Sequence, residues 1–206
     1  MVSTPRTADS RLILASGSPA RAAMLSAAGV EFTVIPASID EAALKQQCRA
    51  EGKDALGCAM VLAQAKACAV AAQHPDTTVI GTDQILVVGD AWLDKPADLV
   101  EAATQLRWLS GRTHTLVTAA CAHQSDMVLW QATATPKLTM RCIGESFLAA
   151  YIEAEGEAVL ASVGAYRIEG RGARLFSQIE GDYFSIRGLP LIELLGFLRE
   201  RGLLGD

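Results

Sequence analysis

Residues 11–35, RLILASGSPARAAMLSAAGVEFTVI, carry the pattern that decides the fold class. The apolar run Arg11–Ala15 predicts a buried strand. The loop Ser16-Gly17-Ser18 follows, and Pro19 opens a helical stretch that stops at a glycine. Serine before a helix, proline at its first position and glycine just beyond its end are common helix boundaries. Because Glu31–Ile35 then alternates like a strand, the order strand, loop, helix, strand predicts an α/β fold.

The rest of the chain mixes strand and helix patterns in the same way. Strands show short apolar or alternating runs, whereas helices show apolar residues three or four positions apart. A glycine-rich loop is expected between the last strands and the final helix. By these criteria the chain contains strands at Thr78–Ile80, Ile85–Val88, His114–Cys121, Met127–Ala134 and Lys137–Cys142, helices at Asp54–Gln73, Leu99–Leu109, Glu145–Ala154 and Leu191–Arg201, and a loop at Gly164–Gly172.

Composition excludes several classes of protein. The 206 residues fit one domain, with a flexible N-terminus at residues 1–10. Lys and Arg number 18 against 23 Asp and Glu, a net charge of −5 without a basic block, so no nucleic-acid partner is expected. No apolar run approaches the roughly 20 residues of a membrane span, and no secretory signal is visible. Five scattered cysteines without a Cys-x-x-Cys pair fit a cytoplasmic protein.

The loop after the first strand is a candidate phosphate site. Ser16 and Ser18 lie where the free N–H groups and the dipole of the following helix attract anions. Arg21 lies in the first helical turn, where its guanidinium could bind phosphate oxygens. The motif is not a Walker A sequence, a GxGxxG fingerprint or a GxSxG elbow. A plain capped helix with a solvated arginine therefore stays an alternative.

Asp83 is the second candidate, because it interrupts the apolar sequence VIGTDQILVV. A buried carboxylate is costly unless it is paired or bound to a metal. Asp83 would act as a metal ligand or as a general base for water, and a turn aspartate is the alternative. Asp40 and Glu41 add further carboxylates, or else only a charge at a helix N-terminus.

Separated cations accompany these carboxylates. Lys66 lies in an Ala-rich helix and Lys95 precedes a proline, although a lysine considered alone is usually a surface residue. His74, His114 and His123 lack metal-ligand spacing, which argues against zinc hydrolysis. From the residues alone, an anion-binding loop, carboxylates and separated cations outline a site for phosphoryl chemistry.

Taken in order, these segments resemble the Maf family of nucleotide pyrophosphatases. The resemblance runs from about Leu12 to Leu198, and several motifs in the right order are far more specific than any one of them. The matching segments are LILASGSPARAAMLSAAGVEF, Ile39-Asp40-Glu41, LAQAKA, VIGTDQILV, Lys95-Pro96, LSGRTHTLVTA and VGAYRIEGRGARLFSQIEGDYFSIRGLPL.

The resemblance implies both a fold and a reaction. The fold is a mixed twisted sheet with flanking helices and two lobes around a deep nucleotide-binding cleft, often as a homodimer. Members of the family hydrolyse the bond between the α- and β-phosphates with a divalent cation, Mg²⁺ or Mn²⁺. Asp83 matches the proton acceptor that activates water, and Glu41 matches an acidic residue expected to hold the metal together with Asp83. The residues expected to bind the triphosphate are Ser16, Ser18, Arg21, Lys66 and Lys95.

Three family positions track base preference, and here they are Ala20, Gln84 and Glu169. Members resembling 7-methyl-GTP pyrophosphatases carry Trp, Gln and Glu there, whereas those resembling dTTP/UTP pyrophosphatases carry Arg, Thr and Gln. The chain matches the first set at two positions and lacks the large side chain at Ala20. Glu169 can accept hydrogen bonds from the N1–H and N2 amino groups of a guanine-type base, and its charge suits a cationic methylated base.

We therefore expect 7-methyl-GTP or another modified nucleotide as substrate. A dTTP/UTP pyrophosphatase of the same family is one alternative. A non-catalytic nucleotide sensor that regulates cell division is another, although the complete set of charged residues argues against it. By analogy with the family, the cellular purpose is house-cleaning of non-canonical nucleotides.

Overall fold

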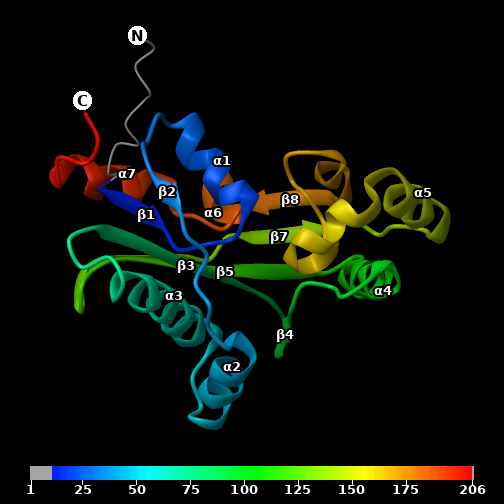
Figure 1. Cartoon of the computed structure of the whole chain (residues 1–206). Helices are drawn as coiled ribbons and strands as arrows, with labels where there is room; N and C mark the ends of the chain where they lie inside the picture. The colour runs from blue at the N-terminus through cyan, green and yellow to red at the C-terminus, as the bar shows by residue number, and fades with distance from the viewer. Residues whose placement is uncertain (1–10, 206) are drawn as a thin grey trace.

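The computed structural model describes residues 11–205 as a mixed sheet flanked by helices (Figure 1). The flexible segment expected at residues 1–10 lies outside the described residues. The strands are β1 (Leu12–Leu14), β2 (Thr33–Val34), β3 (Thr78–Val88), β4 (Ala91–Leu93), β5 (Thr113–Gln124), β6 (Met127–Ala134), β7 (Lys137–Met140) and β8 (Phe176–Glu180). The helices are α1 (Pro19–Ala27), α2 (Glu41–Ala50), α3 (Ala55–Ala71), α4 (Leu99–Leu109), α5 (Glu145–Glu155), α6 (Tyr183–Ile186) and α7 (Leu191–Glu200), with 3₁₀ helices η1 (Gly156–Ala161), η2 (Val163–Ala165) and η3 (Arg171–Leu175).

Two long antiparallel strands, β3 and β5, form the centre of the sheet. They pair from Val79 opposite His123 to Val87 opposite Thr115. The main strand order is β2-β1-β3-β5-β7-β8, in which β1 runs parallel to both β2 and β3. Because β5 occupies one edge of β3, β1 and β4 both pair along its other edge, one near each end. This arrangement confirms the expected mixed sheet with flanking helices.

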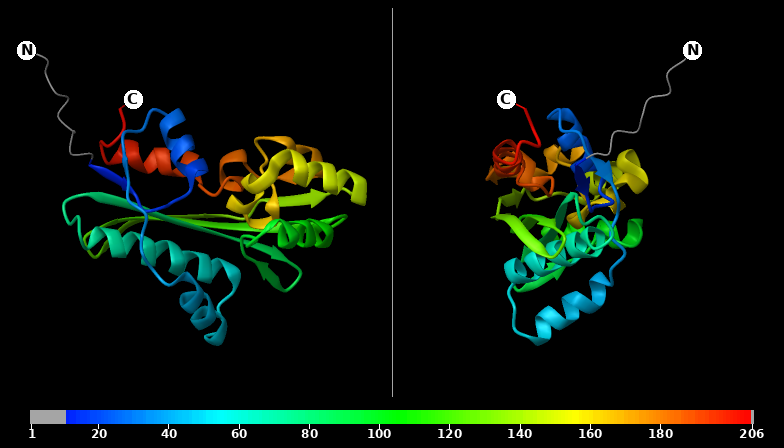
Figure 2. Two further views of the ribbon diagram at one scale, coloured as in Figure 1. Left: turned by 45° about the vertical axis from the view of Figure 1, so that its right-hand side comes forward. Right: turned by 60° about the vertical axis from the view of Figure 1, so that its left-hand side comes forward.

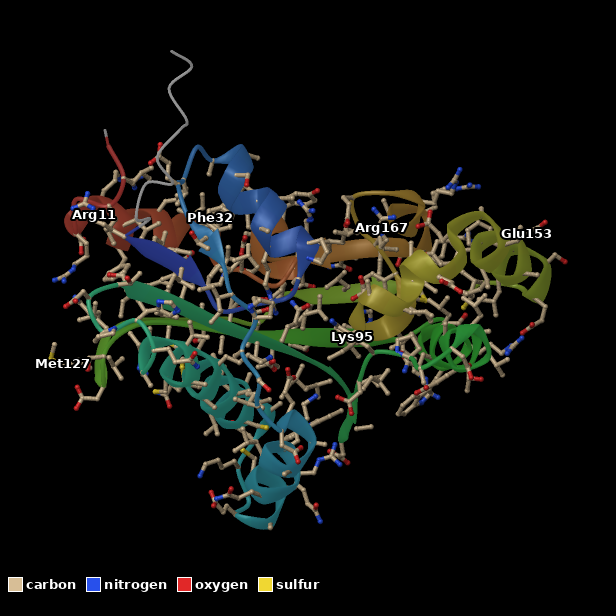
Figure 3. All side chains as sticks on the ribbon, viewed as in Figure 1. Arg11, Phe32, Lys95, Met127, Glu153 and Arg167 are labelled. Atoms are coloured by element: carbon tan, nitrogen blue, oxygen red, sulfur yellow. The ribbon has the colours of Figure 1, made fainter. Side chains whose placement is uncertain are left out.

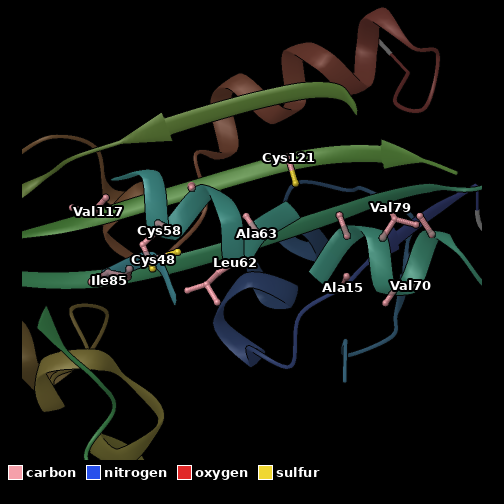
Figure 4. Close-up of a cluster of buried hydrophobic side chains, with 14 of the residues drawn as sticks. Ala15, Cys48, Cys58, Leu62, Ala63, Val70, Val79, Ile85, Val117 and Cys121 are labelled. Carbon is pink, nitrogen blue, oxygen red and sulfur yellow. The ribbon is translucent and has the colours of Figure 1, made fainter. Parts of the chain in front are cut away.

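The hydrophobic core consists of three clusters that follow the two faces of β3. Helix α3 lies along one face, where Ala63 and Leu62 pack near Val79 and Ile85 (Figure 4). On the other face, one cluster joins α1 and α7 to the beginning of β3. A second cluster joins α4 and α5 to the end of β3, and Figure 2 shows these two helix groups at opposite ends of the sheet. The middle of β3 therefore lies between two packed groups of helices.

The predicted pair of strands at Thr78–Ile80 and Ile85–Val88 is wrong, because β3 is continuous from Thr78 to Val88. The polar residues between the two apolar runs have partners in neighbouring elements, so the strand does not break at them. The strand predicted at His114–Cys121 is longer in the structure, because β5 extends to Gln124 and buries His123.

Helix α2 was not predicted as an element, although a helix start at Asp40 and Glu41 was one of the alternatives. Asp40 is its N-cap, and its side chain accepts a hydrogen bond from the N–H of Ala43. The helix carries three charged residues and buries only Cys48, so it has little of the apolar periodicity by which helices are recognised. Across residues 11–205, no helix combines the length and apolar character required to cross a bilayer.

Candidate functional site

Asp83 occupies the middle of β3, at the point where the sheet has an open edge. Strand β1 pairs with β3 up to Ile80, and β4 pairs with it from Leu86 onward. Within the described part of the chain, residues 82–84 therefore have a strand neighbour on the β5 side alone. The turn alternative for Asp83 is excluded. Backbone groups and side chains in the middle of β3 are thus open to contact from outside the sheet.

Gly81 determines how closely α3 approaches this strand. A Cβ atom at this position would overlap the carbonyl oxygen of Ala63 and lie 2.9 Å from the Cβ of Ala67. Side chains two positions apart point to the same face of a strand, so Asp83 points toward α3 as well. Lys66, between the two alanines on α3, is thereby brought within reach of Asp83.

Lys66 joins two carboxylates from different elements. Its Nζ lies 2.6 Å from Asp83 Oδ1 and 2.9 Å from Glu41 Oε1. Lys66 and Asp83 are buried, whereas the Glu41 side chain is about half exposed. Pairing of this kind is what allows charged groups to remain inside a protein. Residues 41, 66 and 83, which are far apart in the sequence, form one charged cluster.

The second oxygen of Asp83 has no partner. Asp83 Oδ2 is buried, and no protein group within residues 11–205 forms a hydrogen bond with it. An unpaired buried carboxylate oxygen costs free energy unless water, a metal or a ligand binds it. The described residues contain no group of three or more metal-ligating side chains, so the protein itself supplies at most Asp83 and Glu41. An oxygen-rich site with two carboxylates fits a Mg²⁺ ion that also binds substrate phosphates.

Arg21 and Ser16 lie beside this cluster at the open edge of β3. The guanidinium of Arg21 donates to Ser16 Oγ at 3.0 Å, to the carbonyl of Thr82 at 3.3 Å and to that of Gly188 at 2.8 Å. Burial lowers the pKa of Arg21, and the charges of Asp83 and Glu41 oppose that shift. An arginine remains protonated in proteins, so the position carries a fixed positive charge.

The loop from Ser16 to Ser18 behaves only partly as predicted. Ser18 has the extended backbone of an N-cap residue, but its side chain makes no capping hydrogen bond. Instead, the N–H of Ser18 donates to Ser16 Oγ at 3.3 Å. The Ser18 hydroxyl is therefore available to a ligand at the start of α1.

Lys95 lies near the same cluster, and Figure 3 shows it close to the centre of the molecule. Burial lowers the pKa of Lys95, and the positive charges of Arg21 and Lys66 lower it further. The negative charges of Glu41 and Asp83 act on Lys95 in the opposite direction and raise its pKa. Lys95 therefore adds a cation without an ion-pair partner of its own within the described residues.

Lys45 is a site neighbour that the sequence analysis missed. It forms an ion pair with Asp94, the residue before Lys95, and so links α2 to the loop after β4. Burial alone would lower the pKa of Lys45, but the hydrogen bond to Asp94 and the charges of Asp94, Asp83 and Glu41 raise it overall. Lys45 follows Glu41 by four residues on one helix, a spacing that places both on the same side. That spacing was the available signal, once α2 was known to be a helix.

Gln84 points to the opposite face of the sheet from Asp83. Its amide nitrogen donates to Thr118 Oγ1 at 2.8 Å and to the carbonyls of Ser185 and Ile186 at 3.0 and 3.2 Å. Carbonyl oxygens only accept hydrogen bonds, so these contacts fix which end of the amide faces inward. The side-chain oxygen of Gln84 accepts no hydrogen bond from residues 11–205. Thr118 lies opposite Gln84 in the β3–β5 pairing, which the sequence could not reveal.

Glu169 lies between two arginines. Its Oε1 is 3.5 Å from Nε of Arg167, and its Oε2 is 3.7 Å from Nε of Arg187. The Arg187 Nε is buried without a hydrogen-bond acceptor in the described chain. Ala20 is the second residue of α1 and is partly buried. Within residues 11–205, no hydrogen bond or ion pair joins Glu169 or Ala20 directly to the Lys66 cluster, so the structure brings together the charged residues more closely than the three base-preference positions.

Comparison with known proteins identifies the family of the chain. The family described as Maf-like protein matches residues 11–201. The chain belongs to the Maf family. A relative from Granulibacter bethesdensis, named nucleoside triphosphate pyrophosphatase, is 50% identical over 190 residues, covering 92% of this chain and 96% of the relative. A relative from Rhizobium etli, named 7-methyl-GTP pyrophosphatase, is 46% identical over 192 residues, covering 93% and 96%.

These findings confirm the predicted Maf membership. Two differently named groups of relatives match at similar identity: a Paramagnetospirillum magneticum protein named nucleoside triphosphate pyrophosphatase is 48% identical, against 46% for the Rhizobium etli protein. Overall identity therefore does not separate a general from a base-specific enzyme. The roles of the individual site residues in this Maf chain stay predictions.

Proposed function

We propose that this chain hydrolyses a nucleoside triphosphate to the monophosphate and pyrophosphate, with 7-methyl-GTP or another modified guanine nucleotide as its preferred substrate. The chain is an enzyme of the hydrolase class, and its relatives' names support nucleoside triphosphate pyrophosphatase activity. The observation that carries the catalytic assignment is the buried, unpartnered Oδ2 of Asp83 beside the Lys66 ammonium.

The cations of the site bind the triphosphate in this proposal. Arg21, with its guanidinium held by Ser16 and two carbonyls, presents a fixed positive charge at the open edge of β3. Lys95 supplies a second charge that a phosphate can neutralise, and the hydroxyl of Ser18 lies at the positive end of α1. Preorganised charges of this kind stabilise the negative charge that builds up on the leaving pyrophosphate.

Asp83 activates the attacking water. Lys66 holds Oδ1, which leaves Oδ2 to orient a water molecule and take its proton. Water adds at the α-phosphorus, the bond from that phosphorus to the α–β bridging oxygen breaks, and pyrophosphate leaves with the bridging oxygen. The ion pair with Lys66 also fixes the direction of the Asp83 carboxylate.

Asp83 and Glu41 would hold a divalent cation, Mg²⁺ or Mn²⁺. Such a cation, when bound, supplies positive charge to the phosphate oxygens. The carboxylates of Asp83 and Glu41 fit such an ion, and the remaining ligands would come from phosphates and water. Lys66 lies between the carboxylates in the described structure and would share them with the metal.

The preference for a guanine-type base rests on hydrogen-bond acceptors. The free side-chain oxygen of Gln84 and the carboxylate of Glu169 both accept, and guanine offers N–H donors at N1 and N2. The attraction of Glu169 for a cationic base is smaller than the sequence suggested, because Arg167 and Arg187 flank the carboxylate. Hydrogen bonding, more than net charge, supports the proposed base. A homodimer and a cytoplasmic location stay part of the proposal on family resemblance.

Pyrophosphate release from a panel of triphosphates tests this function. The purified protein is incubated with Mg²⁺ or Mn²⁺ and 7-methyl-GTP, GTP, dTTP, UTP, CTP or ATP, with Asp83→Asn as the inactive control. We expect the highest kcat/KM with 7-methyl-GTP. Highest turnover of dTTP or UTP would overturn the base preference and keep the reaction, whereas binding without release would favour a nucleotide sensor.

A further inference from the structure

Five charged side chains form a continuous row that includes the base-preference carboxylate Glu169. Glu155 pairs with Arg171 at 3.4 Å and with Arg167 at 3.7 Å. Arg167 pairs in turn with Glu169 at 3.5 Å, and Glu169 with Arg187 at 3.7 Å. Arg167, labelled in Figure 3, thus binds a carboxylate on each side.

Glu155 is an unusual place for a negative charge. Its side chain is only 4% exposed, and it is the last residue of α5, where the helix dipole is itself negative. The next residue, Gly156, has φ 55° and ψ −143°, a conformation that glycine readily adopts and that ends the helix at this point. A buried carboxylate at such a helix end is stable only with cations beside it, and Arg167 and Arg171 supply them.

The loop that carries Glu169 is held tightly against Arg167. The N–H of Gly170 donates to the carbonyl of Arg167 at 3.1 Å, and a Cβ on Gly172 would overlap that same carbonyl. Tyr151, buried beneath, donates a hydrogen bond to the carbonyl of Ala165 at 3.4 Å. Burial raises the pKa of Tyr151 to about 12, and the nearby negative charge of Glu155 adds to that shift. The loop backbone is thus fixed, while the direction of the Glu169 side chain depends on its arginines.

We propose that Arg167, anchored by Glu155, is a positioning residue that holds the Glu169 carboxylate for base recognition. A guanidinium offers five N–H donors in a planar fork, so one arginine can bind two carboxylates in fixed directions. Glu155 holds one side of that fork, and the other side faces Glu169 Oε1. Without Glu155, Arg167 is free to turn to solvent, and Glu169 loses one of the two charges that fix it. The inference rests on the proposed role of Glu169 in reading the base.

The test measures base preference separately from turnover. Dissociation constants of 7-methyl-GMP and UMP are determined by calorimetry, and kcat and KM are determined for 7-methyl-GTP and UTP. The variants are Glu155→Gln, Arg167→Lys, Glu169→Gln and the double variant Glu155→Gln/Glu169→Gln. Arg171→Gln is the matched control, because Arg171 binds Glu155 and forms no ion pair with Glu169 within residues 11–205.

We expect Glu155→Gln and Arg167→Lys to reduce the preference for 7-methyl-GMP over UMP about tenfold, a typical loss for a displaced charged hydrogen bond. The change should appear in KM for 7-methyl-GTP and leave kcat and the UTP constants unchanged. Arg171→Gln should keep the wild-type preference. The double variant should match Glu169→Gln alone, because Glu155 acts through Glu169.

Two results would overturn the inference. In the first, folded Glu155→Gln and Arg167→Lys keep the wild-type preference for 7-methyl-GMP over UMP, whereas Glu169→Gln loses that preference. The other is an equal loss in Arg171→Gln, which would reduce Glu155 to a structural ion pair. Failure of the proposed function gives a different result. The wild type would still bind 7-methyl-GMP more tightly than UMP, but it would release no pyrophosphate from the triphosphates.

Discussion

Lys66 Nζ lies 2.6 Å from Asp83 Oδ1, and both side chains are buried where α3 crosses the middle of β3. This ion pair links α3 to the sheet and leaves the second oxygen of Asp83 free. It also brings the ammonium within 2.9 Å of Glu41 on α2. We therefore expect stability, metal affinity and catalysis to be coupled at Lys66.

Replacement of Lys66 by methionine should separate these effects. Removing one partner of a buried pair strands the other charge, so we expect a loss of about 3 kcal/mol in the free energy of unfolding. Mn²⁺ should then raise the melting temperature more in the variant than in the wild type, because two carboxylates have lost their ammonium. Turnover should fall at least a hundredfold. Calorimetric melting with and without Mn²⁺ measures this, and an equal Mn²⁺ effect in both proteins would contradict metal binding at Asp83 and Glu41.

Lys53→Met is the matched control for that experiment. Lys53 is exposed and pairs with Glu51 at 2.6 Å, away from the site. Exposed ion pairs contribute little to stability. We expect the melting temperature, the Mn²⁺ effect and the activity of this variant to equal those of the wild type.

Gly81→Ala should destabilise the protein and reduce activity together. The added methyl group overlaps Ala63 on α3, so the helix must move away from β3. Overpacking of this kind costs about 3 kcal/mol. The same movement withdraws Lys66 from Asp83.

Gly196→Ala in α7 is the control. The added methyl group meets no atom within 4 Å and should stabilise the chain by up to about 1 kcal/mol. Denaturant unfolding and kcat measure both, and a fully active Gly81→Ala would refute the close-approach argument.

Because Lys95 is partly buried beside other cations, we expect the affinity for the triphosphate to fall at alkaline pH. The pKa of Lys95 lies below the ordinary value for lysine because of burial and the nearby positive charges of Arg21 and Lys66. As pH rises, Lys95 loses its proton earlier than an exposed lysine, and the triphosphate loses a cation. KM should therefore increase toward high pH, whereas Lys95→Arg should show a flatter profile because arginine stays charged. Identical KM profiles for the two proteins would exclude Lys95 from triphosphate binding.

Because His114 is buried, we expect the protein to lose stability in mild acid. Burial lowers the pKa of His114 to about 4, and its Nε2 is hydrogen-bonded with Tyr166 at 2.7 Å. A histidine in the unfolded chain takes up a proton near pH 6.5, so between pH 6.5 and 4 the unfolded state binds more protons and is favoured. Each pH unit in that window should remove up to about 1.4 kcal/mol of the free energy of unfolding.

His114→Gln tests this assignment, because glutamine does not titrate. The variant should be less stable at neutral pH, but its free energy of unfolding should fall less between pH 6.5 and 4. Urea unfolding at several pH values gives the slope. Parallel pH dependences in wild type and variant would show that other groups cause the acid sensitivity.

Part of the site could be predicted because its residues lie in recognisable local motifs. The strand, loop and helix of residues 11–35 predicted the position of Ser16, Ser18 and Arg21 at a helix start, and the structure has α1 beginning at Pro19. Asp83 stood out because a carboxylate buried in an apolar strand costs free energy unless it is paired or bound. Helix α2 escaped detection because its apolar face is small, and β3 was divided because its polar residues looked like a turn.

The sequence by itself determined the candidates for the site residues, the alternation of strands and helices, and membership of the Maf family, because motif order and local periodicity are properties of the linear sequence. Only the tertiary structure decided which of these residues meet. The approach of α3 at Gly81 brings Lys66 to Asp83, and the β3–β5 register places Thr118 against Gln84. It also revealed the row from Glu155 through Arg167 to Glu169. These pairings depend on close packing between elements distant in sequence, for which local patterns carry no signal.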